Sequence, residues 1–340
     1  MRATDGLEVL PVRGIGDVTA GDDLAALITK AAPWLRDGDV LVVTSKIVSK
    51  AEGRLVEVPA DGPERDAARA EALAAETARV VARRGATAIV QTHHGFVMAA
   101  AGIDASNVDK THLVLLPADP DASARALHAA LRERGLRVGV IVSDTMGRAW
   151  RNGLTDVALG AAGISPLRDH RGEIDPYGNE LQLTEMAVID ELAGAGELVK
   201  GKCDQVPVAV VRGYPGAGDA DTPGAGVLLR DAATDMFRLG TAEAMRAAAT
   251  LGDRYDGAGD GAPVEAATVD RALATVAEVL GSGVDHTDDG IRLSGPDPLK
   301  LGEDALRVRI ALAAEGIGSS ARADDQGVLI FLGQPMTHNR

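Results

Sequence analysis

A carboxylate and a hydroxyl follow one β-rich run of the 340-residue sequence. The run VGVIV over residues 138–142 is expected to stop at Ser143, which Asp144 and Thr145 follow directly. Mg²⁺ binds through a few protein oxygens together with substrate phosphates, so this pair suits a hard divalent cation at a strand end. The upstream stretch GIDASN adds Asp104, a carboxylate for a metal, and Asn107, an amide for a base or sugar edge.

Both clusters also have a purely structural interpretation. Short polar residues after a strand form turns and cap helices by accepting hydrogen bonds from backbone N–H groups. Because the two clusters occur in one chain and each supplies a carboxylate, we favour a metal site over two unrelated turns.

Lysines are scarce and clustered. The chain has 28 Arg and 7 Lys, and four of the lysines form two pairs, Lys46 with Lys50 and Lys200 with Lys202. An anionic ligand needs such local basic groups on a chain whose net charge is −15. The alternatives are a solvated helix face for the first pair and a helix C-terminus for the second, where cations are favourable.

Two arginines flank a tryptophan directly after the Asp-Thr pair. Arg148 and Arg151 enclose Trp150 in the stretch GRAWRNG. Arginine forks suit carboxylate and phosphate oxygens, although an Arg-Trp stack that closes a surface is the structural alternative. The later stretch DPYGNE over 175–180 is a turn by composition.

Familiar signatures are missing from the sequence. It contains no GxxxxGK[ST], HExxH or GxSxG pattern, and the glycine pair Gly14 and Gly16 lacks the third glycine of a dinucleotide fingerprint. His93 and His94 have no matching third ligand for a metal, and Cys203 is not expected to be a nucleophile. Spacing alone therefore predicts a metal-dependent, phosphate-handling site and names no substrate.

Composition excludes several other classes of protein. Hydrophobic residues make up 46% and charged residues 25%, as in globular chains, and 50 acidic residues against 35 basic ones disfavour nucleic-acid binding. No apolar run approaches 18 residues, so no membrane partner is expected, and the single cysteine gives no sign of an oxidising compartment. We expect a cytoplasmic protein.

Expected strands and helices alternate along the chain, and they could position these residues. The alternation predicts a mixed α/β (α+β) fold. The expected strands are 7–12, 39–44, 88–91, 112–116, 137–142 and 207–212, and the expected helices are 64–84, 121–135, 185–195 and 241–250. 

A Gly- and Asp-rich stretch over 251–263 is expected to be a linker. It would join a domain over 1–250 to a small α/β domain of unknown role over 264–340. In that domain the patterns predict helices at 264–281 and 301–315 and strands at 290–293 and 327–332.

Six ordered motifs resemble a known family over residues 7–247. They are LEVLPVRGIGDVTAGDDL, DVLVVTSKIVSKAEGRLV, AAAGIDASNV, VSDTMGRAWRNGLTDVALGAAG, DPYGNEL and LVKGK. Together they look like the coenzyme F420-0:L-glutamate ligases, the GTP-dependent gamma-glutamyl ligases of deazaflavin biosynthesis.

The resemblance implies a reaction and its partners. GTP would phosphorylate the terminal carboxylate of F420-0, and the amine of L-glutamate would attack the acyl phosphate, with further rounds adding gamma-linked glutamates. It also implies Mg²⁺ or Mn²⁺, preferably with K⁺, and a homodimer with an intertwined fold. 

Residue by residue, the resemblance assigns roles to positions of this chain. The family's nucleotide loop falls on Ile15, Gly16, Asp17 and Val18, where this sequence departs from the commoner Leu-Pro form, and further nucleotide positions fall on Ser45, Lys50 and Asn107. Asp104 and Asp144 match ligands of one metal, and Thr145 matches a ligand of a second. We expect Asp144, Lys50 and Arg148 to be catalytic.

The C-terminal tail has no such match. Many members of the family carry a C-terminal flavin-binding, nitroreductase-like domain of roughly 200 residues, which the remaining 75–90 residues do not resemble. We therefore expect no FMN and take the tail as a docking or dimer-supporting domain. A related GTP- and metal-dependent ligase acting on another carboxylate remains an alternative, whereas a non-catalytic GTP-binding regulator would have lost a metal ligand.

Overall fold

The computed structural model describes the chain apart from residues 1–5, 107, 203, 219–220, 251–263 and 336–340. The chain divides into two compact units, 1–231 and 232–340. The expected linker lies outside the described residues, so it and the boundary at 250 stay predictions.

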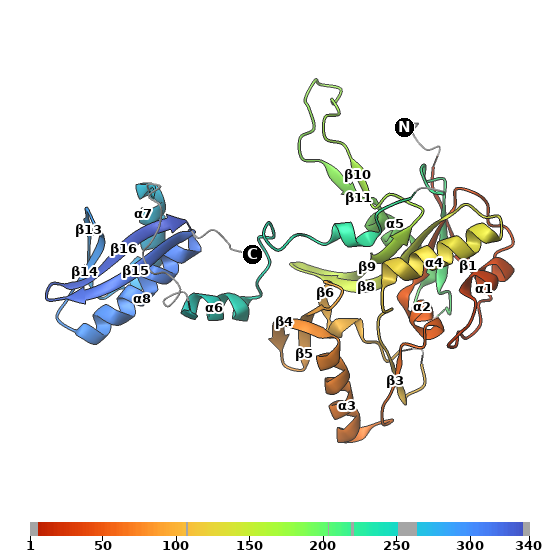
Figure 1. Ribbon diagram of the computed structural model, residues 1–340, viewed down its shortest axis with the longest axis horizontal. Helices are drawn as coiled ribbons and strands as arrows, with labels where there is room; N and C mark the ends of the chain where they lie inside the picture. Colours follow the sequence, from red (N-terminus) through yellow and green to blue (C-terminus); the bar gives the residue numbers. More distant parts are fainter. Residues whose placement is uncertain (1–5, 107, 203, 219–220, 251–263, 336–340) are drawn as a thin grey trace. The chain divides into compact units, whose positions relative to one another are not determined.

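A five-stranded mixed sheet in the order β1-β12-β2-β8-β9 is the centre of the first unit (Figure 1). Its strands are β1 (Glu8–Val12), β2 (Val40–Thr44), β8 (Gly139–Arg148), β9 (Arg151–Ala162) and β12 (Val208–Arg212). Among these described strands, β2 and β8 are parallel and the other neighbouring pairs are antiparallel. Together with the helices, this mixed sheet confirms the predicted α+β class.

Helices cover both faces of this sheet. The helices are α1 (Leu24–Ala31), α2 (Ser45–Ala51), α4 (Pro120–Glu133) and α5 (Val188–Lys200). Successive strand residues point to opposite faces, so Leu41 and Val43 pack with α1 and α4, whereas Val40 and Val42 pack with α5. A Cβ at Gly196 would lie 2.9 Å from Val42, which requires glycine where α5 crosses β2.

A smaller layer holds two short sheets. They are formed by β3 (Leu55–Glu57) with β7 (His112–Val114), and by β4 (Thr77–Arg84), β5 (Thr87–Thr92) and β6 (Val97–Ala99). The expected helix over 64–84 is wrong in its second half, because α3 (Gly62–Ala75) ends before β4. Thr77, Val80 and Val81 are β-branched, and pairing with β5 overrides the helical composition.

An arm projects from the first unit (Figure 1). The strands β10 (Leu167–Asp169) and β11 (Glu185–Ala187) pair at its base. The predicted turn in this arm is confirmed, since the Asp175 carboxylate accepts hydrogen bonds from the backbone N–H groups of Tyr177 and Asn179, both at 2.8 Å.

The second unit repeats an αββ order twice. After α6 (Thr241–Thr250) come α7 (Ala266–Val276), β13 (Gly283–Thr287), β14 (Gly290–Ser294), α8 (Pro298–Ala314), β15 (Ile317–Asp324) and β16 (Gly327–Pro335). The antiparallel sheet has the order β13-β14-β16-β15, and one core joins it to α7 and α8. The strands β13 and β15 were not predicted. No helix in the described ranges has the length and apolar character to cross a membrane.

Candidate active site

The carboxyl ends of β1, β2 and β8 point to one edge of the central sheet. β12 is antiparallel to β1 and to β2, and β2 is parallel to β8, so these three strands run the same way. The predicted nucleotide loop follows β1, Ser45 follows β2, and Asp144 follows the residue of β8 that pairs with Thr44. β12 begins at this edge, so the chain leading into it brings Lys200 and Lys202 there.

The predicted nucleotide loop has two buried and two exposed side chains. Ile15 and Val18 are buried in the core beneath the sheet, whereas Gly16 and Asp17 are exposed. A ligand at this loop would therefore meet backbone groups and the Asp17 side chain. Asn107, the other predicted nucleotide contact, lies outside the described residues.

The short helix α2 supplies three of the candidate groups. Ser45 is its first residue, and the hydrogen bond from its side chain stabilises the Asp144 carboxylate. Lys46 Nζ lies 2.6 Å from Asp104 Oδ2. Lys50, one turn further along, is partly buried in the last turn of the helix.

A tight left-handed turn presents Asp104. Ala100, Ala101 and Gly102 have φ values of 49°, 54° and 70°, a conformation that is unusual for the two alanines because they carry a Cβ. Beyond the turn, the Asp104 carboxylate accepts hydrogen bonds from Lys46 Nζ and from the N–H of Ser106. Burial opposes ionisation of Asp104, but these hydrogen bonds outweigh it and hold its pKa below the usual value.

Asp144 lies within a strand, which corrects the expectation that the strand stops at Ser143. A bulge between Val142 and Ser143 interrupts the ladder, and β8 then continues because β9 pairs with it to the end of the hairpin. Loss of solvent and, to a smaller extent, the neighbouring charges of Asp156 and Asp104 raise the pKa of Asp144 to about 6. The hydrogen bond from the Thr145 N–H opposes this rise. 

Asp156 and Lys200 form a buried ion pair next to Asp144. Lys200 Nζ lies 2.7 Å from Asp156 Oδ2 and 3.0 Å from Ser143 Oγ, and the side chains of Lys200 and Asp156 are 3% and 2% exposed. The Thr145 hydroxyl donates to Asp156 Oδ1 over 2.7 Å. Burial raises the pKa of Asp156, but Lys200 outweighs this effect and the pKa is lowered overall.

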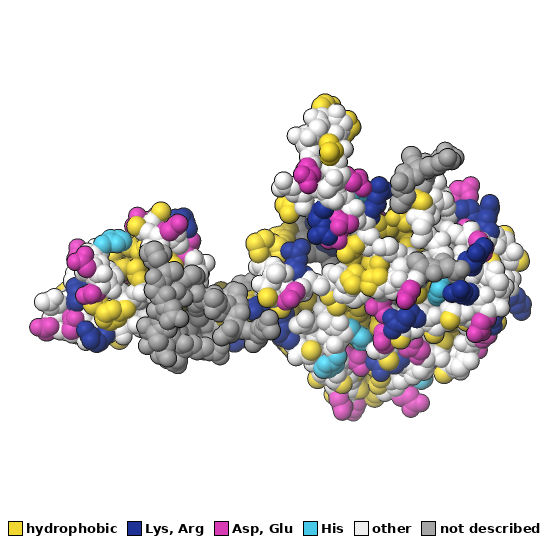
Figure 2. Space-filling view, turned by 45° about the horizontal axis from the view of Figure 1, so that its top comes forward, with side chains coloured by type: hydrophobic (Ala, Val, Ile, Leu, Met, Phe, Trp, Pro, Cys, Tyr) yellow, Lys and Arg dark blue, Asp and Glu magenta, His cyan; other side chains and the backbone are white. Residues whose placement is uncertain are grey.

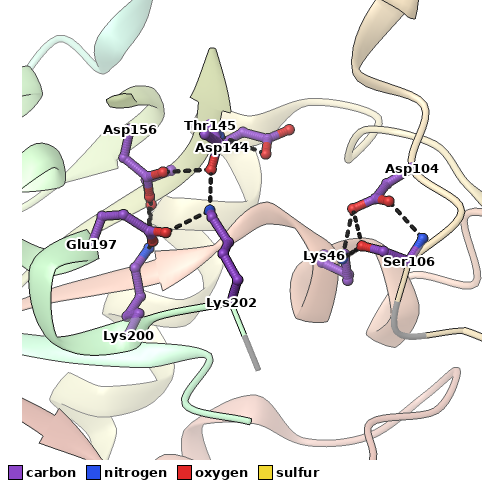
Figure 3. A network of polar contacts seen from close by, with 10 residues as sticks. Lys46, Asp104, Ser106, Asp144, Thr145, Asp156, Glu197, Lys200 and Lys202 are labelled. Carbon is purple, nitrogen blue, oxygen red and sulfur yellow. Dashed lines mark hydrogen bonds and ion pairs between the residues drawn. The ribbon is translucent and has the colours of Figure 1, made fainter. Parts of the chain in front are cut away.

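Lys202 reaches the same hydroxyl from the other side. Its Nζ donates to Thr145 Oγ1 over 2.7 Å and lies 2.5 Å from Glu197 Oε1 on α5. Figure 3 shows this group around Thr145 beside the second group formed by Lys46, Asp104 and Ser106.

These residues fit one divalent cation better than two. Asp144 is a partly buried carboxylate next to other carboxylates, and no lysine or arginine of the described chain forms an ion pair with it. Asp104 adds a second carboxylate, which keeps acceptor sites beyond its contacts with Lys46 and Ser106. The two carboxylates match the one or two that Mg²⁺ uses beside substrate phosphates. The Thr145 hydroxyl instead already contacts Asp156 and the Lys202 ammonium, so it does not fit a second cation.

Three predicted or weighed candidates lie away from this group. Arg148 is exposed near the hairpin tip, four residues or about 13 Å of extended strand from Asp144, and hydrogen bonds to the Asn152 carbonyl. His93 and His94 contact backbone carbonyls of Ala75 and Pro117. Among residues that the structure describes, no three His, Cys, Asp or Glu side chains are arranged to hold a metal.

Sequence reasoning missed Asp156 and Glu197. Asp156 directly precedes the small and apolar run VALGAAG, and Glu197 precedes Lys200 by about one helical turn. Both positions could have been noted as partners for the lysine pair, but only the register of β8 with β9 shows which groups they meet.

Carboxylates and lysines that gather at one edge of a sheet beside an exposed loop are typical of an enzyme active site. A family profile described as F420-0:Gamma-glutamyl ligase matches residues 14–213. Among curated relatives, the coenzyme F420:L-glutamate ligases of Methanothermobacter thermautotrophicus and Haloarcula marismortui are each 42% identical to this chain, and that of Methanopyrus kandleri is 39% identical.

The alignments cover 68% of this chain in each case, and 99%, 96% and 98% of those three relatives respectively. The chain therefore belongs to the F420-0:gamma-glutamyl ligase family and is a ligase. This confirms the resemblance drawn from the six motifs. The matched profile ends before the second unit, which begins at Ala232.

Proposed function

We propose that the chain adds L-glutamate to coenzyme F420-0 at the expense of GTP, with successive gamma-glutamyl additions, in coenzyme F420 biosynthesis. The observation that carries the proposal is the convergence of the loop after β1, Ser45 after β2 and Asp144 of β8 on one sheet edge. Relatives with that printed activity align over nearly their whole length.

The proposed reaction has two steps. A carboxylate oxygen of F420-0 attacks the γ-phosphorus of GTP, the bond from that phosphorus to the β–γ bridging oxygen breaks, and GDP leaves. The glutamate amine then attacks the acyl carbon, phosphate leaves with the electrons of the carbon–oxygen bond, and the nitrogen loses a proton to give an amide.

Neutralisation of charge is the main task of the site, because the first step brings two anions together. Asp104 and Asp144 would hold Mg²⁺ or Mn²⁺, which would supply positive charge to the phosphate oxygens. Lys46 already lies at this edge through its contact with Asp104. Lys50 on the same helix is proposed to bind the phosphates, with K⁺ as an activating ion.

The roles of the remaining predicted residues follow from their positions. Gly16 and Asp17 are proposed to meet the nucleotide together with the backbone at Ile15 and Val18, whose side chains belong to the core. Arg148 remains a proposed catalytic cation. Its exposed position on the hairpin requires that the bound substrate extend toward it.

A homodimer is proposed on the basis of the projecting arm. Its side chains Ile174, Tyr177 and Leu183 are 72%, 91% and 93% exposed, and Figure 2 shows hydrophobic groups at its tip. Apolar side chains gathered on a projecting hairpin are typical of an interaction surface. We propose that a second copy of this chain covers them.

Further proposals concern the environment of the enzyme and its tail. We propose that the enzyme acts in the cytoplasm and that its second unit contributes no FMN-dependent step. An absorbance spectrum of the purified protein would test the latter, since bound flavin would contradict it.

Trapping with hydroxylamine tests the acyl phosphate. Incubation with GTP, F420-0 and Mn²⁺ but without glutamate should yield a hydroxamate of F420-0 in amounts equal to the GDP formed. ATP in place of GTP should give little product. GDP without hydroxamate would contradict the proposed intermediate, and equal yields from ATP would contradict the nucleotide preference.

A further inference from the structure

The Thr145 hydroxyl has little capacity left for a second metal ion. A hydroxyl has one hydrogen and two acceptor sites. Its hydrogen is directed to Asp156 Oδ1 and one acceptor site receives the Lys202 ammonium, each over 2.7 Å. A divalent ion bound to this oxygen at about 2.1 Å would lie close to the ammonium, and two like charges at such separation repel strongly.

The Lys202 side chain is 63% exposed, and its ammonium group is paired with a carboxylate of α5. Glu197 Oε1 lies 2.5 Å from Lys202 Nζ. Gly201 has a φ of 62° and reverses the chain after α5, and a Cβ there would lie 2.6 Å from Asp204 Oδ2. Glycine at this position therefore lets the lysine fold back toward β8.

Local charge also favours a single divalent ion. Around Thr145 lie two ammonium groups and three carboxylates, those of Lys200, Lys202, Asp144, Asp156 and Glu197. The formal charges of these five side chains sum to −1. One divalent cation therefore gives the group a net charge of +1, and a second would raise it further. Without the Lys202 ammonium, the Thr145 hydroxyl and the Glu197 carboxylate would be oxygen groups of the kind that Mg²⁺ and Mn²⁺ prefer.

We propose that the Lys202 ammonium takes the place of a second divalent cation beside Thr145, so that each active site holds one divalent ion. This inference rests on the proposed function, because it assumes a divalent ion at Asp104 and Asp144. It assigns Lys202 a positioning role toward Thr145 and a role in metal stoichiometry.

Counting bound Mn²⁺ tests the inference without turnover. The full chain is titrated with Mn²⁺ in the presence of β,γ-methylene-GTP, and free Mn²⁺ is followed by electron paramagnetic resonance. The unaltered chain should bind one ion, and Lys202→Met should double this to two, with spin coupling between the ions. Lys202→Arg keeps the cation and should stay at one, as should the exposed control Lys110→Met.

Other outcomes overturn the inference in distinguishable ways. Two ions on the unaltered chain would contradict it and leave the proposed function intact. One ion on folded Lys202→Met would show that Lys202 does not exclude the second cation. No bound Mn²⁺ on the unaltered chain would contradict both the inference and the metal dependence of the proposed function.

Discussion

Thr145 on β8 and Asp156 on β9 lie opposite each other in the ladder, and the Thr145 hydroxyl donates to the Asp156 carboxylate over 2.7 Å. This contact ties the conformation of the site to the register of the hairpin. Lys200 completes the arrangement from α5, on the other side of the carboxylate. The buried pair therefore connects two strands and a helix beneath the proposed metal ligand Asp144.

Removal of the Lys200 charge should destabilise the first unit. Lys200→Met leaves the buried Asp156 carboxylate without its counter-ion, which typically costs about 3–5 kcal/mol. Urea unfolding at pH 7, followed by tryptophan fluorescence, measures the free energy. Trp34 and Trp150 both lie in this unit.

Two matched variants distinguish the ion pair from the loss of a lysine in general. Lys30→Met, at an exposed position, should change the free energy of unfolding by less than about 0.5 kcal/mol. Adding Asp156→Leu to Lys200→Met should recover much of the loss, because it removes the isolated charge. Unchanged stability in Lys200→Met would contradict the importance of the pair.

Asp144→Asn should abolish GTP turnover without unfolding the chain. The amide keeps the size of the side chain but removes the charge proposed to bind a divalent ion, and we expect a loss of about 100-fold or more in GDP release. Burial already raises the pKa of Asp144 to about 6 in the metal-free chain, so its neutral isostere should fold. Near-normal ligation by this variant would show that Asp144 is not a required ligand.

The second unit should lose stability in acid through Asp304 of α8. Burial opposes ionisation of this carboxylate, but hydrogen bonds from Ser282, the Gly281 N–H and Arg307 hold its pKa well below the usual value. Because the pKa of Asp304 is lower in the folded state than in the unfolded state, its ionised form stabilises the fold. This stabilisation is fully present above the unfolded-state pKa of about 4 and is lost as the pH falls toward the folded-state pKa.

Asp304→Asn should therefore destabilise the second unit at pH 7 and have a smaller effect at pH 3. The stability of this unit is measured by hydrogen exchange: protection factors of peptides from α8 are followed as a function of urea concentration at both pH values. The exposed control Asp288→Asn should follow the unaltered chain. An equal loss of protection at both pH values would exclude the role of the Asp304 charge.

Replacing an apolar residue of the arm with a charge should dissociate the proposed dimer. Leu183→Asp would place a carboxylate where Leu183 is 93% exposed in the single chain and buried in the proposed interface. Sedimentation velocity should then give a monomer. Leu299→Asp, at a 74% exposed position of α8, should leave the dimer unchanged. A monomeric unaltered chain, or a dimer that survives Leu183→Asp, would refute this interface.

The local sequence pattern predicted the strands that carry the candidate site better than it predicted strands elsewhere in the chain. The strand expected at 39–44 is observed at Val40–Thr44, because a short apolar run rich in valine is buried on both faces. The strand β15 was missed, since half of its residues are exposed and its conformation depends on pairing with β16.

The candidate site was predictable in part for a related reason. Asp104 and Asp144 could be selected because each follows an apolar segment and carries a metal-ligating group. The contact between Lys202 and Thr145 joins residues 57 positions apart. It depends on how α5 packs on the sheet and on the turn at Gly201, which no local spacing reveals.

Mass-resolved ligation tests the central claim most directly. Purified protein is incubated with F420-0, L-glutamate, GTP and Mn²⁺, and the products are separated by mass. The proposed function predicts a GTP-dependent increase by one glutamate residue, followed by further identical increments. GTP hydrolysis without that increment would contradict F420-0 as the acceptor, and the absence of both products would contradict the assignment of this edge as a GTP-dependent active site.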